Sequence, residues 1–95
     1  MQKVENSKIS IMTMINKWKK SELGFRYMML SRLKSDCDYF LGYGERDESK
    51  LWAGSVKEQI KNMLAIWWTL PMRAKPEWLA VKQIIAYHSE MKGNK

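Results

Sequence analysis

Cys37 and His88 are the side chains of this 95-residue chain best suited to nucleophilic catalysis. A thiol becomes a strong nucleophile when a neighbouring base takes its proton, so a Cys–His pair is the minimal arrangement. The sequence has one cysteine and one histidine, and no third group that would orient the histidine is evident. We therefore expect Cys37 to pack in a helix stripe, His88 to lie on a solvated helix face, and the protein not to be an enzyme.

Patterns for metal or cofactor binding are weak. A structural zinc site normally uses four nitrogen or sulfur ligands, which one cysteine and one histidine cannot supply. Asp36 and Asp38 are two residues apart and would point in different directions on a helix. The acidic stretch at 45–48 lacks the spacing of a calcium loop, and Gly-Tyr-Gly at 42–44 lacks the third glycine of a phosphate loop. We expect neither a metal nor a cofactor.

Basic and aromatic side chains are mixed near the start of the chain. Trp18 stands among Lys17, Lys19 and Lys20, a combination that suits phosphate contact together with base stacking. The same pattern is typical of an amphipathic helix that inserts its tryptophan into the core of its own protein. The sequence alone allows both interpretations.

A second aromatic and basic group follows in the last third of the chain. Trp67 and Trp68 are adjacent on a predicted helix, so their rings point about 100° apart. Trp67 fits the core stripe, which places Trp68 at its edge or outside it, where tryptophan is a frequent binding hot spot. Alternatively, Trp68 packs under a loop or against residues 8–20. Arg73 and Lys75, in a turn bounded by two prolines, could extend a basic surface.

Helical periodicity predicts the elements that must position these residues. Residues 21–41 repeat apolar side chains at i, i+3, i+4 and i+7, and Gly42 ends this helix. The predicted stripe comprises Leu23, Tyr27, Leu30, Cys37 and Leu41, with Met28, Leu33 and Phe40 beside it. A capping box at Ser55–Glu58 begins another helix, which Pro71 ends. The last helix starts within 77–81 and continues to about Lys92, before Gly93.

The connection at 42–54 is long for a small domain, which favours a contact surface. Tyr43 and Arg46 lie in its first half, and Leu51 and Trp52 would anchor its second half to the core. A short helical turn through 47–52 is compatible with the sequence. We therefore expect an all-α fold, a small bundle of three to four helices with one long central loop.

The first twenty residues are ambiguous. Ile9, Ile11, Thr13 and Ile15 alternate as in a strand, whereas Ile11, Met14, Ile15 and Trp18 have helical spacing. We favour a helix after a frayed start at 1–7, and we divide the chain into a basic segment at 1–20 and a helical domain at 21–95.

The net charge of +7 is concentrated at the two ends of the chain. Residues 1–20 carry five lysines against one glutamate, and residues 72–95 carry five basic against two acidic side chains, whereas 21–71 are balanced. If the ends meet, they form a basic patch for phosphate or an acidic protein; if not, they are solvated. The absence of a signal-peptide core and of an apolar run of about 18 residues predicts a cytoplasmic protein without membrane contact.

One stretch resembles a known family. Residues 30–46, with the string Ser-Asp-Cys-Asp-Tyr-Phe-Leu-Gly-Tyr-Gly, are similar to the opening of the large polyvalent protein associated domain, type eleven. The resemblance continues through Leu-Trp-Ala-Gly at 51–54, Lys-Glu-Gln-Ile at 57–60 and Lys-Pro-Glu-Trp-Leu at 75–79, and covers about residues 25–91.

Domains of this family are encoded by phages and conjugative elements, so the resemblance implies a mobile-element origin. It implies no catalytic residues. Ala80 stands where the family leads us to expect a small hydroxyl residue that caps the last helix, which suggests an alternative helix start near Pro76. Residues 1–20 lie outside the resemblance.

Together these features favour a non-enzymatic phage or mobile-element protein that binds and modulates host machinery. Its partner would be a host protein, for instance a defence nuclease or a nuclease–nucleic-acid complex, as for an inhibitor of anti-CRISPR type. The alternative is a small basic nucleic-acid-binding protein, and the sequence allows a monomer or a dimer. The candidate contact residues are Lys17, Trp18, Lys19, Lys20, Tyr43, Arg46, Trp68, Arg73 and Lys75.

Overall fold

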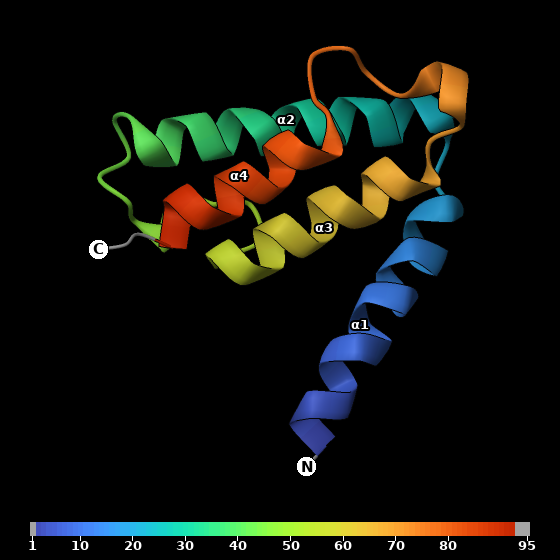
Figure 1. Cartoon of the computed structure of the whole chain (residues 1–95), viewed down its shortest axis with the longest axis horizontal. Helices are drawn as coiled ribbons and strands as arrows, with labels where there is room; N and C mark the ends of the chain where they lie inside the picture. Colours follow the sequence, from blue (N-terminus) through green and yellow to red (C-terminus); the bar gives the residue numbers. More distant parts are fainter. Residues whose placement is uncertain (1, 93–95) are drawn as a thin grey trace.

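The computed structural model describes the backbone of residues 2–92 and the side chains of residues 11–92. Within this part the chain forms α-helices and no strand, which confirms the all-α prediction (Figure 1). The helices are α1 (Gln2–Lys19), α2 (Leu23–Leu41), α3 (Val56–Thr69) and α4 (Val81–Lys92). Two short 3-10 helices, η1 (Glu48–Lys50) and η2 (Met72–Ala74), lie in the connections. None of the described helices is both long and apolar enough to cross a membrane.

Helix α3 is the centre of the bundle, because it packs against each of the other three α-helices. Helices α2 and α4 also contact each other, whereas α1 runs off at an angle and packs mainly against α3 (Figure 1). The α1 backbone confirms the helix favoured for residues 8–20. It also extends back to Gln2, so the expected fraying is wrong for residues 2–7, since no glycine or proline separates them from the rest of the helix.

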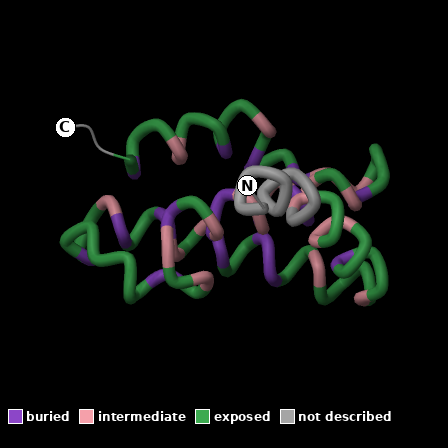
Figure 2. The backbone as a smooth tube through the Cα atoms, turned by 90° about the horizontal axis from the view of Figure 1, so that it is seen from below, coloured by how far each residue is buried: buried purple, intermediate pink, exposed green. Residues whose placement is uncertain are grey.

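The core lies between α2, α3 and α4 and also includes Trp18 of α1; buried positions alternate with exposed ones along the bundle (Figure 2). Leu30, Leu33, Ile66 and Ile84 are fully buried, and each contributes about 1.5–3 kcal/mol through the apolar surface that it removes from water. The predicted stripe of α2 is partly wrong, because Leu23, Tyr27 and Met28 are exposed while Met29 is buried, and Leu41 is only partly buried. Helix α2 is apolar on several sides, so the position of α3 and α4 decides which side is covered.

Local signals set the helix ends. The Ser55 hydroxyl accepts a hydrogen bond from the Glu58 N–H at 3.2 Å, as expected for the first half of a capping box. The Val56 N–H donates to the Glu48 carboxylate at 2.9 Å, and the Glu58 carboxylate lies 3.6 Å from the Lys61 ammonium. Glu48 thus reaches across from η1 to satisfy an N–H at the start of α3.

Helix α4 begins at Val81, inside the predicted range, so the alternative start near Pro76 is wrong. The Gln83 side-chain oxygen accepts from the Ala80 N–H at 2.7 Å. This side chain therefore satisfies the N–H of the residue before the helix, as the second half of a capping box does, while the Gln83 N–H bonds to the Ala80 carbonyl at 2.9 Å.

Asp36 and Asp38 do point in different directions from α2. The Asp38 carboxylate accepts from the Tyr87 hydroxyl at 2.5 Å and from the Lys34 ammonium at 2.9 Å, which ties α4 to α2. Burial and the bond to Asp38 raise the pKa of Tyr87 to about 12, so this hydroxyl remains a donor at neutral pH. Asp36 turns instead toward the loop at 42–55.

Candidate protein-binding surface

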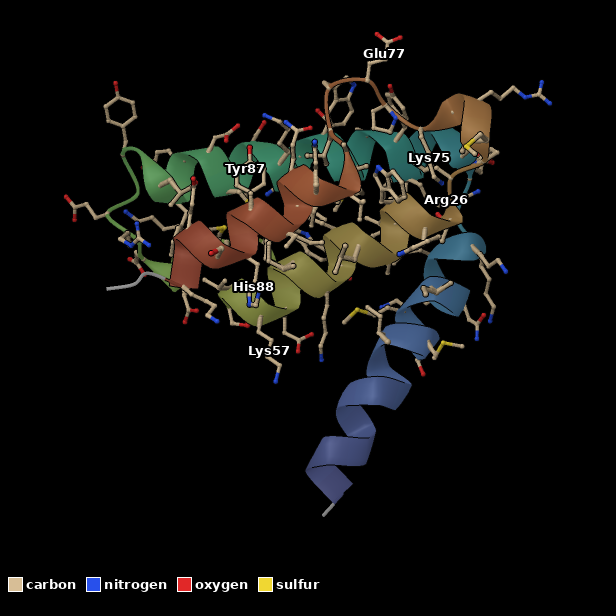
Figure 3. All side chains as sticks on the ribbon, in the orientation of Figure 1. Arg26, Lys57, Lys75, Glu77, Tyr87 and His88 are labelled. Atoms are coloured by element: carbon tan, nitrogen blue, oxygen red, sulfur yellow. The ribbon has the colours of Figure 1, made fainter. Side chains whose placement is uncertain are left out.

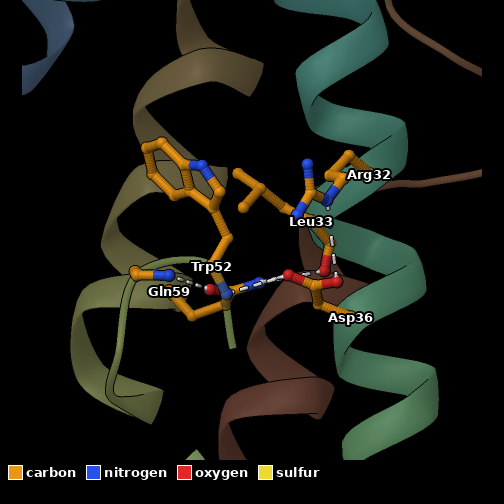
Figure 4. Close-up of polar contacts among 6 residues, drawn as sticks. Arg32, Leu33, Asp36, Trp52 and Gln59 are labelled. Atoms are coloured by element: carbon orange, nitrogen blue, oxygen red, sulfur yellow. Dashed lines mark hydrogen bonds and ion pairs between the residues drawn. The ribbon is translucent and has the colours of Figure 1, made fainter. Parts of the chain in front are cut away.

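The second half of the 42–55 loop is fixed to the bundle by a buried polar side chain, Gln59 (Figure 4). Its side-chain oxygen accepts from the Ala53 N–H at 3.0 Å, and its amide nitrogen donates to the Leu33 carbonyl at 3.2 Å and to the Asp36 carboxylate at 3.4 Å. Asp36 also accepts from the Trp52 N–H at 2.9 Å. Because these bonds join α2, α3 and the loop, the loop is a fixed part of the fold.

The first half of the loop is a tight turn at the end of α2. The Gly44 N–H donates to the Tyr39 carbonyl at 2.6 Å, and the Arg46 N–H donates to the Phe40 carbonyl at 3.1 Å. Gly44 has no room for a side chain, because a Cβ there would lie 2.9 Å from the Tyr39 oxygen. Glu45 and Arg46 have φ values of 56° and 58°, a left-handed conformation that costs non-glycine residues about 1–3 kcal/mol each.

The Arg46 side chain supports this strained turn. Its guanidinium group lies 5.6 Å from the centroid of the Phe40 ring and donates a hydrogen bond to the Glu90 carbonyl near the end of α4. The loop is therefore attached to α2 and α4 at once. Tyr43, at the tip of the turn, has 88% of its surface exposed. The fold thus presents an aromatic ring to solvent on a backbone that is already ordered.

An open groove of about 1070 Å³ lies beside this loop, between α3 and α4. Its floor consists of the apolar side chains Phe40, Val56, Ile60, Leu64 and Met91. Its rim carries the basic side chains Arg46, Lys57, Lys61 and Lys92, and His88. Figure 3 labels two of these side chains, Lys57 from α3 and His88 from α4. The groove combines residues of four separate segments, and only Arg46 among the rim residues was a predicted contact residue.

The acidic side chains of the groove are already engaged. Glu48 holds the start of α3, and Asp47 accepts two hydrogen bonds from Ser49, which lower the pKa of the Asp47 carboxyl. Lys57 and Lys92 are exposed and have no ion-pair partner among the described residues. These bonds leave both carboxylates negatively charged, but the lining carries four basic side chains against two acidic ones, so the groove offers an apolar floor and a rim with excess positive charge.

The basic and aromatic residues near the start of the chain separate into two roles. Lys17, Lys19 and Lys20 are exposed at the end of α1. The Trp18 side chain is only 7% exposed, and its indole N–H donates to the Asn62 side-chain oxygen at 3.0 Å. The prediction that Trp18 stacks on nucleic-acid bases is therefore wrong, and the alternative holds: this tryptophan fills the protein's own core.

Lys75 is also used structurally. Its ammonium group donates to the Trp67 carbonyl at 3.1 Å and to the Leu70 carbonyl, and it lies 4.3 Å from the Trp67 ring centroid. A cation at this position caps the C-terminal end of α3, and burial lowers its pKa. The expectation that Lys75 extends a basic surface is wrong for this reason, whereas Arg73 is exposed.

Trp68 is 62% exposed, so the alternative that it packs under a loop or against residues 8–20 is wrong. Trp68 follows Lys57, Lys61 and Leu64 at the i+4, i+7 and i+11 spacing of one helix face, which continues from the groove along α3. This spacing is the sequence signal that could have identified Lys57 and Lys61.

Within the described residues, the structure does not bring the lysines at the end of α1 next to the end of α4. The last turn of α1 and the last turn of α4 lie at opposite ends of the bundle (Figure 1). The lysines at the end of α1 therefore form a surface separate from the groove, which includes Lys92. Among the described side chains, the lysines at the end of α1 and Lys92 therefore do not form a single basic patch.

Cys37 and His88 occupy different environments. Cys37 is fully buried with its sulfur 3.6 Å from that of Met63, whereas His88 lines the groove. Burial, together with the negative charges of Asp38 and Asp36, raises the pKa of the Cys37 thiol to about 12, so the nucleophilic thiolate is scarce at neutral pH. No group of three or more potential metal ligands is assembled in the part of the chain that the structure describes.

Residues 23–91 match the family model of large polyvalent protein-associated domain 11. The matched part contains the 42–55 loop and nearly all of the groove, and leaves out α1. Neither a curated protein nor a solved structure matches the chain.

Proposed function

The chain belongs to the large polyvalent protein-associated domain 11 family and is associated with phages or mobile elements, and from this premise we propose that it binds and modulates a host protein without catalysing a reaction. The observation that carries the proposal is the preformed surface of the 42–55 loop and the adjoining groove. The loop holds Tyr43 in solvent, and the groove places an apolar floor beside Lys57 and Lys92, which have no ion-pair partner among the described residues.

Such a surface suits protein recognition for an energetic reason. Binding normally costs free energy because loops and side chains must be ordered. The 42–55 loop is already held by Gln59, Asp36 and Arg46, so little backbone order remains to be imposed. Tyrosine also has few rotatable bonds and combines an apolar ring with a polar hydroxyl, which makes it a frequent hot spot.

A host defence nuclease is the specific partner class that we favour. The chain has a net charge of +7, so it does not imitate the phosphates of DNA. It would act as an inhibitor by covering an acidic face of the enzyme. Nuclease sites that hold catalytic metal ions commonly provide such a face, because carboxylates bind these ions. A positive rim around an apolar groove complements a surface of this kind.

Replacing Tyr43 with alanine is expected to weaken the captured complex by at least about tenfold, as for a hot-spot residue. Because Tyr43 is exposed, the free energy of unfolding should change by less than about 0.5 kcal/mol. Affinity purification from a host that carries defence nucleases, followed by titration of the recovered protein, measures the effect. Met72→Ala is the matched control, since Met72 is 84% exposed on η2, away from the loop. Failure to recover any specific host protein contradicts the proposed function.

Direct nucleic-acid binding is the second candidate, and it is favoured by the three exposed lysines at the end of α1. With Trp18 buried, this binding would depend on phosphate contacts alone. Three such contacts predict that the affinity for double-stranded DNA falls about 40-fold between about 50 and 200 mM salt. Reversing the charges of Lys17, Lys19 and Lys20 should then abolish binding. If DNA and RNA do not bind at the lower salt concentration, these lysines are solvated surface charges and the nucleic-acid-binding candidate is rejected.

A further inference from the structure

The groove between α3 and α4 has dimensions that fit a segment of another protein. Its volume of about 1070 Å³ lies at the upper limit of the roughly 300–1,000 Å³ typical of small-molecule sites, and it is open to solvent. The α3 residues that line it extend from Val56 to Leu64. Eight steps at 1.5 Å per residue make the groove about 12 Å long, which corresponds to about two turns of a bound helix.

The groove walls favour an occupant whose backbone is already hydrogen-bonded. The walls are mainly helices α3 and α4, whose backbone groups bond within each helix, and the described residues include no strand edge to which an extended peptide could add. The floor is mainly aliphatic, with Phe40 as its one aromatic side chain, whereas grooves that bind proline-rich peptides are lined by aromatic rings. An amphipathic helix meets these conditions, because its backbone is satisfied internally and one face is apolar.

The rim determines the charge of that helix. Lys57 and Lys92 are exposed residues of the groove lining, on α3 and α4 respectively, and His88 of α4 lines the groove as well. Asp47 and Glu48 accept hydrogen bonds from Ser49 and from the Val56 N–H and keep their negative charges, but the four basic side chains of the lining outnumber these two carboxylates. Glutamate or aspartate flanking the apolar face of the ligand would meet the two lysines.

We propose that this groove binds an acidic amphipathic α-helix of the partner protein, with the apolar face of that helix on Ile60, Leu64 and Met91 and its carboxylates beside Lys57 and Lys92. The assignment rests on the proposed function, because it specifies the part of the host protein that is recognised. It also predicts binding of isolated helical peptides, which can be measured without knowing the host protein.

The test uses the full chain and three synthetic peptides labelled for fluorescence anisotropy. The first has leucines at i, i+3, i+4 and i+7 and glutamates elsewhere; the second has the same composition in scrambled order; the third replaces every glutamate with lysine. We expect the first peptide to bind at least about tenfold more tightly than the other two, and its affinity to fall with added salt.

Charge reversal locates the binding site. Lys57→Glu combined with Lys92→Glu should weaken binding of the first peptide by about tenfold at low salt. The matched control is Lys19→Glu combined with Lys20→Glu, which changes the net charge equally at the end of α1 and should alter the affinity by less than about twofold. His88 is the only histidine, so its ring proton resonances in the unmodified protein should shift when the first peptide binds.

Three results would overturn the assignment: equal binding of the first and scrambled peptides, an unchanged affinity of the Lys57/Lys92 variant, or binding that leaves the His88 resonances unmoved. These failures are distinguishable from failure of the proposed function. Capture of a host protein without peptide binding refutes the acidic-helix assignment only. Peptide binding without any captured host protein supports the groove assignment and refutes the proposed host-protein function.

Discussion

Replacing Trp18 with alanine is expected to lower the free energy of unfolding by about 3–5 kcal/mol, the usual cost of removing a large aromatic side chain from a core. The Trp18 ring is stacked on that of Phe25 with centroids 6.2 Å apart, and it lies 6.3 Å from that of Trp52. One side chain therefore joins α1 to the start of α2 and to the 42–55 loop. Denaturant titration followed by circular dichroism measures the change.

Two further substitutions make the Trp18 result specific. Trp18→Phe retains an aromatic ring but removes the bond to Asn62, so it should cost about 1–3 kcal/mol, less than alanine. Lys19→Ala removes an exposed neighbour and should change stability by less than about 0.5 kcal/mol. If Trp18→Ala leaves stability unchanged but reduces DNA binding, the tryptophan contacts nucleic acid and α1 is not held as described.

Gln59→Leu is expected to cost about 2–3 kcal/mol, even though the two side chains have similar size. Leucine cannot accept from the Ala53 N–H or donate to the Leu33 carbonyl and Asp36, and each buried group left without its partner costs about 1–3 kcal/mol. The substitution should also destabilise the loop locally, because Gln59 and Asp36 accept the hydrogen bonds of the Ala53 and Trp52 N–H groups. Hydrogen exchange at these two backbone N–H groups should accelerate more than exchange in the middle of α2.

The control for Gln59 is Gln83→Leu, which removes the same type of side chain from an exposed position at the start of α4. The Ala80 N–H that it leaves free can bond to water, so the expected cost is below about 1 kcal/mol. Equal stability losses for the two variants would contradict the role of Gln59 as a buried attachment for the loop. If Gln59→Leu loosens the 42–55 loop, partner binding through Tyr43 should also weaken. The loop would then have to be ordered on binding, and that ordering costs free energy.

Gln59 and Trp18 differ in their position relative to the family domain. Gln59 and the loop lie within the matched residues 23–91, whereas α1 and Trp18 lie outside them. The loop and groove are thus parts of the family domain, and α1 is an additional helix that Trp18 holds on its surface. A Trp18 variant that retains the fold of the remaining helices should therefore retain peptide binding in the groove.

The sequence by itself determined the helical class, most element boundaries and the family. The signals for these features are local: Gly42 follows α2, Ser55 accepts from the Glu58 N–H, and Pro71 follows α3 within two residues of its end. Local hydrogen bonds and backbone restrictions act between residues close in the chain, so the order of residues is sufficient to predict them.

Only the tertiary structure decided which side chains are available for binding. Spacing placed Trp18, Tyr27 and Lys75 on particular helices or turns, but neighbours distant in the chain buried Trp18, left Tyr27 exposed and turned Lys75 onto the end of α3. The groove likewise joins Phe40, residues 46–48, α3 and the end of α4. Helix periodicity specifies only the direction in which a side chain leaves its own helix. Burial depends on how several helices pack against one another, and helices with apolar residues on many sides allow more than one packing.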